Sequence, residues 1–147
     1  MAAGKGDEAP LISMTVEERE PNPLVRVIVR GLMSDEAGAK ALLKLYTEHP
    51  RAPYYDRLFD LTEYKTGLDA QNLARVASAY RELNTDPSFP CRTAIVTRDP
   101  HFHLWARTMD FQFEGRQHRA FTIVEEAERW LATPLDERKA EMAGPQD

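Results

Sequence analysis

The sequence predicts an α/β domain built on a single mixed β-sheet, with the element order β-β-α-β-α-β-α-β-α. Two runs of alternating apolar residues, at 11–18 and 25–31, stand on either side of the break Pro21-Asn22-Pro23, a pattern typical of a β-hairpin. After this hairpin, helical and strand-like segments alternate along the chain. That alternation favours βα units, whose strands are parallel and whose helices pack on the sheet.

The composition is that of an ordinary globular protein of one domain. The chain has 147 residues, of which 42% are hydrophobic and 29% are charged. These values exclude collagen-like, disordered and coiled-coil classes for most of the chain, and the length leaves little room for a second domain. We divide the chain into a disordered N-terminal segment at 1–10, a domain at 11–132, and a charged tail or short satellite helix at 133–147.

Charge and cysteine content narrow the setting of the protein. The net charge is −5, which disfavours a general nucleic-acid binder, because such domains are usually basic. The single cysteine, Cys91, has no partner for an internal disulfide and favours a reducing compartment. The N-terminal residues lack the apolar core of a secretory signal, and no window approaches the roughly 18 apolar residues of a membrane-spanning helix. We therefore expect a cytoplasmic protein with no transmembrane segment.

The first half of the βα region has clear helix and strand signals. A helix is expected from Ser34, whose hydroxyl caps the first turn, to about Glu48. A strand rich in aromatic and apolar residues follows at 54–61, and a polar loop follows at 62–67. The next helix, at 69–84, has a capping Asp at its start and one apolar stripe.

The second half repeats this alternation. The β-branched run at 92–97 predicts a buried strand. A helix is expected from Asp99-Pro100, an N-cap followed by proline at the first helical position, to about Glu114. The last strand is predicted at 119–124 and the last helix at 125–131.

Three short motifs, in this element order, resemble the SpoIIAA-like branch of the STAS domains, which is also described as STAS/SEC14-like. They are Tyr55-Asp-Arg-Leu-Phe-Asp-Leu61, Arg92-Thr-Ala-Ile-Val96, and a closing helix with Phe121, Glu125-Glu126-Ala127 and Trp130-Leu131. The resemblance covers about 11–132. It implies a non-enzymatic regulatory module that binds a protein partner or a second copy of itself. Its SEC14 side implies, as an alternative, a carrier of a small hydrophobic or lipid-like ligand.

The resemblance also directs attention to Thr66. Anti-sigma-factor antagonists of this fold carry a phosphorylatable Ser or Thr just before a Gly at the start of the helix after the third strand, and Thr66-Gly67 stands at the comparable place. A helix N-terminus there would stabilise a phosphate. The loop is shorter than in that family, and Lys65 replaces the usual Asp, so a simple turn is the favoured interpretation.

The helix predicted at 100–114 has large apolar side chains on opposite faces. At 100° per residue, Leu104 and Phe111 lie nearly opposite the face that is expected to enter the core, with Thr108 beside them. They predict contact with a protein partner, a second copy or a small apolar ligand. The alternatives are an early end of the helix near Asp110 and coverage by the C-terminal tail. The core face is expected to hold Phe102, Trp105, Ala106, Met109 and Phe113.

A mildly basic segment overlaps this helix. Between Arg92 and Arg119 the chain has five arginines, Arg98 and Arg107 among them, against three acidic residues. The segment suggests an acidic partner or an anionic headgroup, although arginines on a solvated face are the ordinary explanation.

An enzyme is a third, less favoured hypothesis. Asp60, Thr97 and Arg98 stand at predicted strand carboxyl ends, where open α/β sheets bind ligands. Asp56 lies on the same strand face as Asp60, and for these aspartates a strand-end cap or an ion pair with Arg57 or Arg92 is favoured over catalysis. The sequence contains no Gly-x-Ser-x-Gly elbow and no P-loop.

The sequence predicts no metal and no cofactor. His101 and His103 are two residues apart, so on a helix they point about 200° apart and do not chelate one ion together. Cys91 has no second thiol with which to form a structural zinc site, and at the edge of a buried strand its thiol is expected to be inert.

Overall fold

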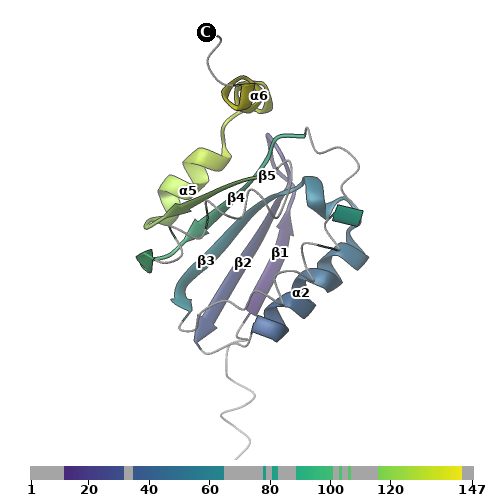
Figure 1. Cartoon of the computed structure of the whole chain (residues 1–147), viewed down its shortest axis with the longest axis vertical. Coiled ribbons are helices and arrows are strands. Elements are labelled where there is room, and N and C mark those ends of the chain that lie inside the picture. Colours follow the sequence, from purple (N-terminus) through teal and green to yellow (C-terminus); the bar gives the residue numbers. More distant parts are fainter. Residues whose placement is uncertain are drawn as a thin grey trace, which may run out of the picture.

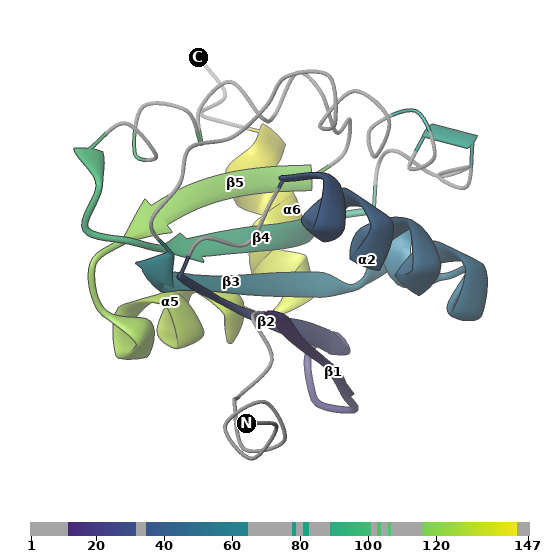
Figure 2. The ribbon, with the colours of Figure 1, turned by 90° about the horizontal axis from the view of Figure 1, so that it is seen from below.

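The computed structural model describes residues 12–31, 35–64, 78, 81–82, 89–100, 103, 106 and 116–143. A five-stranded sheet runs through it in the order β1-β2-β3-β4-β5, with β1 and β5 at its two ends (Figure 2). β1 and β2 are antiparallel, and every later pair of neighbours is parallel, so the predicted mixed sheet is confirmed. The strands are β1 (Ile12–Glu17), β2 (Leu24–Gly31), β3 (Asp56–Tyr64), β4 (Cys91–Val96) and β5 (Arg116–Phe121).

Helices cover both faces of this sheet. Figure 1 shows α2 (Asp35–Glu48) on one side and α5 (Val124–Leu131) on the other. A short 3-10 turn, η1 (Ala52–Tyr54), precedes β3, and α6 (Leu135–Ala143) follows α5. The helices predicted at 69–84 and 100–114 lie largely outside the described residues.

The β1–β2 hairpin follows the predicted alternation. Val25, Val27 and Val29 are buried beneath α2, because their side chains share one face of β2. Arg26, Ile28 and Arg30 share the other face and are half-buried, as the sequence indicated.

Two apolar clusters hold the layers together, one on each face of the sheet. On the α2 side, the buried residues are Val25, Val27, Val29, Ala39, Leu45, Tyr46, Ala52, Leu61, Ile95 and Ala106. On the α5 side, they are Leu24, Leu58, Ala94, Val96, Ala127 and Leu131. A parallel sheet buried on both faces requires near-continuous apolar strands, and all six residues of β4 are buried.

The predicted start and end of the 54–61 strand are wrong. Tyr54 belongs to η1, which contains Pro53, so the strand begins at Asp56. At its other end β3 continues to Tyr64, through residues that were predicted as a polar loop. The reason is pairing with a neighbour, because Glu63 lies opposite Arg30 and Tyr64 lies opposite Gly31 on β2.

The last strand begins three residues earlier than predicted, at Arg116, and ends at Phe121. Its register explains the shift, since Arg116 pairs with Cys91 and Phe121 pairs with Val96, so β5 matches β4 along its length. β4 itself runs one residue earlier than the predicted 92–97. Beyond Phe121, the β-branched Ile123 occupies the N-cap of α5 instead of a strand, in extended backbone with φ −130° and ψ 131°.

A buried ion pair joins α6 to the sheet. Arg138 of α6 and Asp56 of β3 have no exposed surface, and two guanidinium nitrogens of Arg138 each donate to one carboxylate oxygen of Asp56 at 2.7 Å. The other donors of Arg138 reach the backbone carbonyls of Pro90, Leu131 and Thr133. Every N–H direction of this guanidinium is therefore used. The segment expected to be a charged tail or satellite helix thus places a charged side chain inside the fold.

The Asp56 carboxylate also joins two further parts of the chain. One oxygen accepts hydrogen bonds from the side-chain amide of Asn22, at 3.2 Å, and from the backbone N–H of Arg92, at 2.9 Å. Asn22 lies in the hairpin break, and Arg92 lies on β4. The predicted ion pair of Asp56 with Arg57 or Arg92 is replaced by one with Arg138.

Removal of either partner of this pair is expected to destabilise the fold strongly. Arg138→Ala leaves the Asp56 carboxylate buried without its counter-charge, and we expect the free energy of unfolding to fall by about 3–5 kcal/mol. Urea unfolding followed by circular dichroism measures this loss. Lys139→Ala, at an exposed neighbour on the same helix, is the matched control and should change stability by less than about 0.5 kcal/mol. Equal losses in the two variants would contradict the role given to Arg138.

Candidate interaction surface

Several predicted site residues fall outside the described part of the chain. They are Thr66, Leu104, Arg107, Thr108 and Phe111. Phosphorylation of Thr66 and docking through the helix at 100–114 therefore remain predictions. Of the core face expected for that helix, Ala106 is described and is buried in the α2-side cluster.

Thr97 directly follows the end of β4, but Asp60 lies inside β3, which continues to Tyr64 instead of ending near Asp60 as predicted. Asp60 lies opposite Val96, the residue before Thr97. The Asp60 carboxylate accepts hydrogen bonds from the backbone N–H of Thr62, at 3.1 Å, and from its hydroxyl, at 2.7 Å. This carboxylate is therefore engaged by Thr62, two residues further along the same strand.

Thr97 is also engaged by its surroundings. It is 2% exposed, its backbone N–H donates to the carbonyl of Phe121, and its hydroxyl accepts from the backbone N–H of Asp99. A ring nitrogen of His103 lies 3.1 Å from the Thr97 carbonyl. Arg98 is exposed to solvent. The contacts of Asp60 and Thr97 are made within the fold, and a ligand crevice beside them remains a prediction.

The basic segment does not form a surface patch from all of its arginines. Arg92 and Arg116 are 1% and 2% exposed. Arg116 donates to the carbonyls of Pro53 and Tyr55 and to the hydroxyl of Thr93. Of the described arginines in this segment, Arg98 and Arg119 are exposed. Arg92 and Arg116 are therefore not part of a basic surface, contrary to the prediction, because they are buried and donate hydrogen bonds inside the fold.

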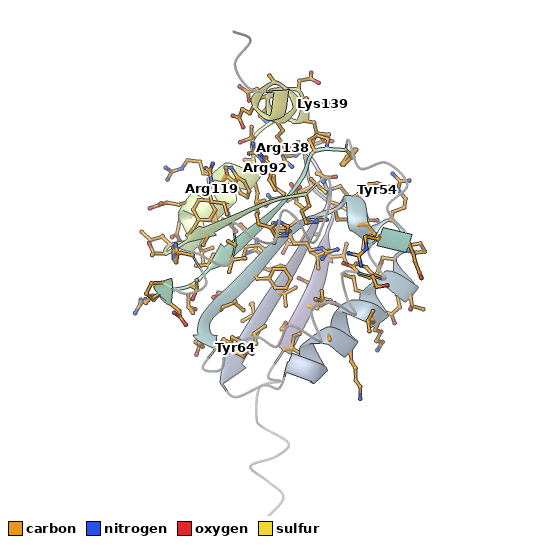
Figure 3. All side chains as sticks on the ribbon, in the orientation of Figure 1. Tyr54, Tyr64, Arg92, Arg119, Arg138 and Lys139 are labelled. Carbon is orange, nitrogen blue, oxygen red and sulfur yellow. The ribbon has the colours of Figure 1, made fainter. Side chains whose placement is uncertain are left out.

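Arg92 instead links β4 to the last two helices. Its guanidinium lies over the ring of Trp130, 4.6 Å from the centroid, and donates to the Trp130 carbonyl and to Glu141 of α6. Figure 3 shows Arg92 and Arg138 close together beneath α6. Burial, and then the nearby positive charge of Arg138, lower the pKa of Arg92.

A surface groove lies between β1 and α2. Its volume is about 340 Å³. Apolar side chains of both elements line it, and charged or titratable side chains stand on its α2 side. We call it the β1–α2 groove, and its lining residues are Met14, Val16, Ala41, Lys44, Leu45, Glu48 and His49.

The groove follows from the way α2 sits on the sheet. The side of α2 that enters the core packs on the valines of β2, and its Leu45 and Tyr46 are 4% and 3% exposed. Met14 and Val16 of β1 are only partly buried by that contact. The small side chain of Ala41 leaves space above them, so β1 has an apolar face that α2 covers incompletely.

The outer edge of β1 adjoins this groove. Among the strands that the structure describes, β1 pairs with β2 alone, so its other edge has no strand beside it (Figure 2). Edge strands are usually protected by lysine, proline or a bulge. β1 has neither residue, its register with β2 is continuous over six pairs, and its one charge is the terminal Glu17.

The opposite edge of the sheet differs in its chemistry. β5 contains Arg116, His118 and the exposed Arg119. Charged side chains along an edge oppose the addition of another strand. Of the two sheet edges, β1 is therefore the one suited to strand addition.

On the other face of β1, an ion-pair network holds the hairpin against α5. Arg26 of β2 contacts Glu17 of β1 at 2.8 Å and Glu128 of α5 at 2.7 Å. The hydrogen bond from Arg26 lowers the pKa of Glu17, against a smaller opposing effect of burial. The hydrogen bond to Glu17 raises the pKa of Arg26. The terminal charge of β1 is thus tied to the face away from the groove.

The described residues contain neither a group of metal-ligating side chains nor a membrane-spanning helix. Within them, no three His, Cys, Asp or Glu side chains are grouped to hold a metal ion. Cys91 is buried, and its thiol donates to the carbonyl of Pro53. None of the helices described in the structure has the length and apolar character needed to cross a membrane.

Comparison with solved structures agrees with this architecture. A protein of the DUF3478 family from Shewanella loihica PV-4, uncharacterized and described as having a SpoIIAA-like fold, aligns with a TM-score of 0.53 and 19% identity. The alignment covers 84% of this chain and 98% of that chain. The fold is SpoIIAA-like. No protein-family model and no curated protein matches the sequence.

The residues of the three SpoIIAA-like motifs meet in space. Asp56, from the first motif, binds the backbone of Arg92 in the second. Arg92 lies over Trp130 of the third, while Ala127 and Leu131 of that motif are fully buried. These residues therefore have structural roles in the SpoIIAA-like fold, and none of them lines the β1–α2 groove.

The Arg26 network gives a pH-dependent prediction. Arg26→Gln should lower the free energy of unfolding by about 0.5–1 kcal/mol at pH 7. Because the folded-state pKa of Glu17 is lowered, this contribution exists above the ordinary glutamate pKa and is lost as the pH falls below about 4. Urea unfolding of both proteins at pH 7 and pH 3 measures the difference.

The control for this experiment is Arg30→Gln, whose more exposed ion pair with Glu63 spans 3.5 Å. We expect a smaller change at both pH values. An Arg26→Gln effect that persists at pH 3 would contradict an electrostatic contribution from Glu17.

Proposed function

We propose that this chain is a non-enzymatic, SpoIIAA-like interaction module that binds an extended polypeptide segment at the outer edge of β1. The observation that carries the proposal is an edge strand whose one charge is the terminal Glu17, beside a groove lined in part by Met14 and Val16. The resemblance to STAS domains, whose members act as regulatory and protein-interaction modules, supports the same class of function. Binding of this kind extends the sheet by one strand.

The two features supply the two parts of strand recognition. Main-chain N–H and C=O groups along the edge of β1 would give hydrogen bonds that any extended segment can use. Alternate side chains of that segment would fall on the α2 side of the sheet, over Met14 and Val16. An apolar side chain at every second position is therefore the preferred pattern in the bound segment.

The groove suits a polypeptide better than a small apolar ligand. Sites for small molecules commonly enclose 70–90% of the ligand surface. On the α2 side of the β1–α2 groove, Lys44 and Glu48 have side chains that are 75% and 56% exposed, so this side does not enclose a ligand. A lipid-like molecule would remain largely in water, whereas a strand would also hydrogen-bond to β1.

A peptide-selection experiment tests this proposal. Random extended peptides displayed on phage and selected on the purified chain should converge on alternating apolar residues. Binding of the selected peptides, measured by fluorescence anisotropy, should weaken at least tenfold in Met14→Glu, because a buried carboxylate opposes apolar contact. Val16→Thr, which keeps the shape of the side chain, should weaken binding in the same direction.

The matched control is Thr47→Glu, which adds the same charge at an exposed residue of α2 that does not line the groove. Its affinity should stay within about twofold of the unmodified chain, and circular dichroism verifies that each variant is folded. Failure to enrich such peptides, or equal effects of Met14→Glu and Thr47→Glu, would overturn the proposal.

A further inference from the structure

We propose that the segment bound at this edge is β1 of a second copy of the chain. Two copies would pair β1 with β1 in antiparallel orientation about a twofold axis at Met14. The two five-stranded sheets would then form one continuous sheet. This inference rests on the proposed function, because it names the occupant of the same edge.

The residue pattern of β1 is self-complementary in this register. A twofold axis normal to the sheet places α2 of both copies on the same face of the joined sheet. Residues of β1 that face α2 in one copy therefore lie opposite residues that face α2 in the other copy. With Met14 opposite Met14 of the second copy, Ile12 lies opposite Val16, and Ser13 lies opposite Thr15. Every pair on the α2 side is then apolar, and every pair on the other side within 12–16 is a pair of hydroxyls.

A shift of one residue would remove this match. Met14 would lie opposite a hydroxyl residue, and the two α2 helices would fall on opposite faces of the sheet. The apolar face of β1 in one copy would then continue into a polar face in the other. The register centred on Met14 is therefore the favoured one.

Charges also permit the pairing of two copies. Glu17 lies three residues from the axis, so the two Glu17 residues would be about 20 Å apart along the strands, which exceeds the screening length of about 8 Å in physiological salt. Each Glu17 is already paired with Arg26. Lys44 and Glu48 place opposite charges one helical turn apart beside the groove, 4.0 Å from each other. These opposite charges cancel within one copy, so this margin of the groove adds no net charge that would oppose a second copy.

Sedimentation and light scattering of the full chain, over a wide range of concentration, test the pairing. We expect a dimer whose dissociation constant rises at least tenfold in Met14→Lys and in Met14→Glu, since each variant places two like charges opposite each other at the axis. An equimolar mixture of these two variants should restore the dimer, because the charges at the axis are then opposite. Thr47→Glu, at an exposed α2 residue that does not line the groove, should leave the dimer unchanged.

A cross-linking measurement tests the register with a milder substitution. In Met14→Cys, the two new cysteines would lie directly opposite each other, with Cα atoms about 4.5–5.5 Å apart, within disulfide range. Mild oxidation should give a covalent dimer, and Ser13→Cys, whose cysteines would be offset along the strands, should cross-link at least tenfold more slowly. Cys91 is buried and serves as the internal background.

The outcomes separate the two proposals. A chain that is monomeric at every concentration, or a dimer that survives both charged variants, would overturn pairing through β1. Faster cross-linking of Ser13→Cys than of Met14→Cys would overturn the register and the twofold at Met14. If the monomeric chain still binds alternating peptides through Met14, this inference fails while the proposed function stands.

Discussion

The buried pair formed by Asp56 and Arg138 is the constraint on which the arrangement of the chain depends. One carboxylate at the start of β3 binds the hairpin break through Asn22, the next strand through the backbone of Arg92, and α6 through a guanidinium. Charges removed from water are costly unless they are paired and fully hydrogen-bonded. These parts of the chain therefore take positions that give the Asp56 carboxylate its counter-charge and its hydrogen bonds. The cost of leaving any one of them unpaired makes the arrangement specific.

This constraint gives the two ends of the sheet different characters. The side of β3, β4 and β5 carries buried arginines, the stacked Trp130, and helices α5 and α6. The motifs that resemble SpoIIAA-like domains lie there, and their residues maintain the fold. The hairpin end is simpler, since β1 is held by its ladder to β2, by apolar contact beneath α2, and by Arg26 on the other face. Among the described strands, β1 therefore has both an edge without a neighbouring strand and a partly buried apolar face, which are the two elements that strand recognition uses.

The network around Asp56 and the proposed binding edge of β1 are separate for a physical reason. Arg138 uses all of its N–H donors inside the fold, and Arg92 donates to Gln117, Trp130 and Glu141, so the charged cluster around Arg92 and Arg138 stabilises the molecule. β1 has unused main-chain hydrogen-bonding capacity along its outer edge, as judged from the strands that the structure describes. The proposed binding of a strand at this edge would leave the network around Asp56 undisturbed.

The amino-acid sequence determined the hairpin, the first helix and the alternation that specifies a mixed sheet, because each depends on local periodicity, capping and turn chemistry. It did not determine the limits of β3 and β5, because these strands end where the ladders to β2 and β4 end. The sequence also did not predict the ion-pair partner of Asp56, because Arg138 is 82 residues away and lies in a segment whose composition resembles a solvated tail. The alternation that places Met14 and Val16 on one face was visible in the sequence. Whether β1 is an edge strand, and whether a groove lies beside it, depends on which elements pack next to it in the fold. Only the tertiary structure decided that this face is left partly open, because it places β1 at the edge of the sheet and packs α2 over β2.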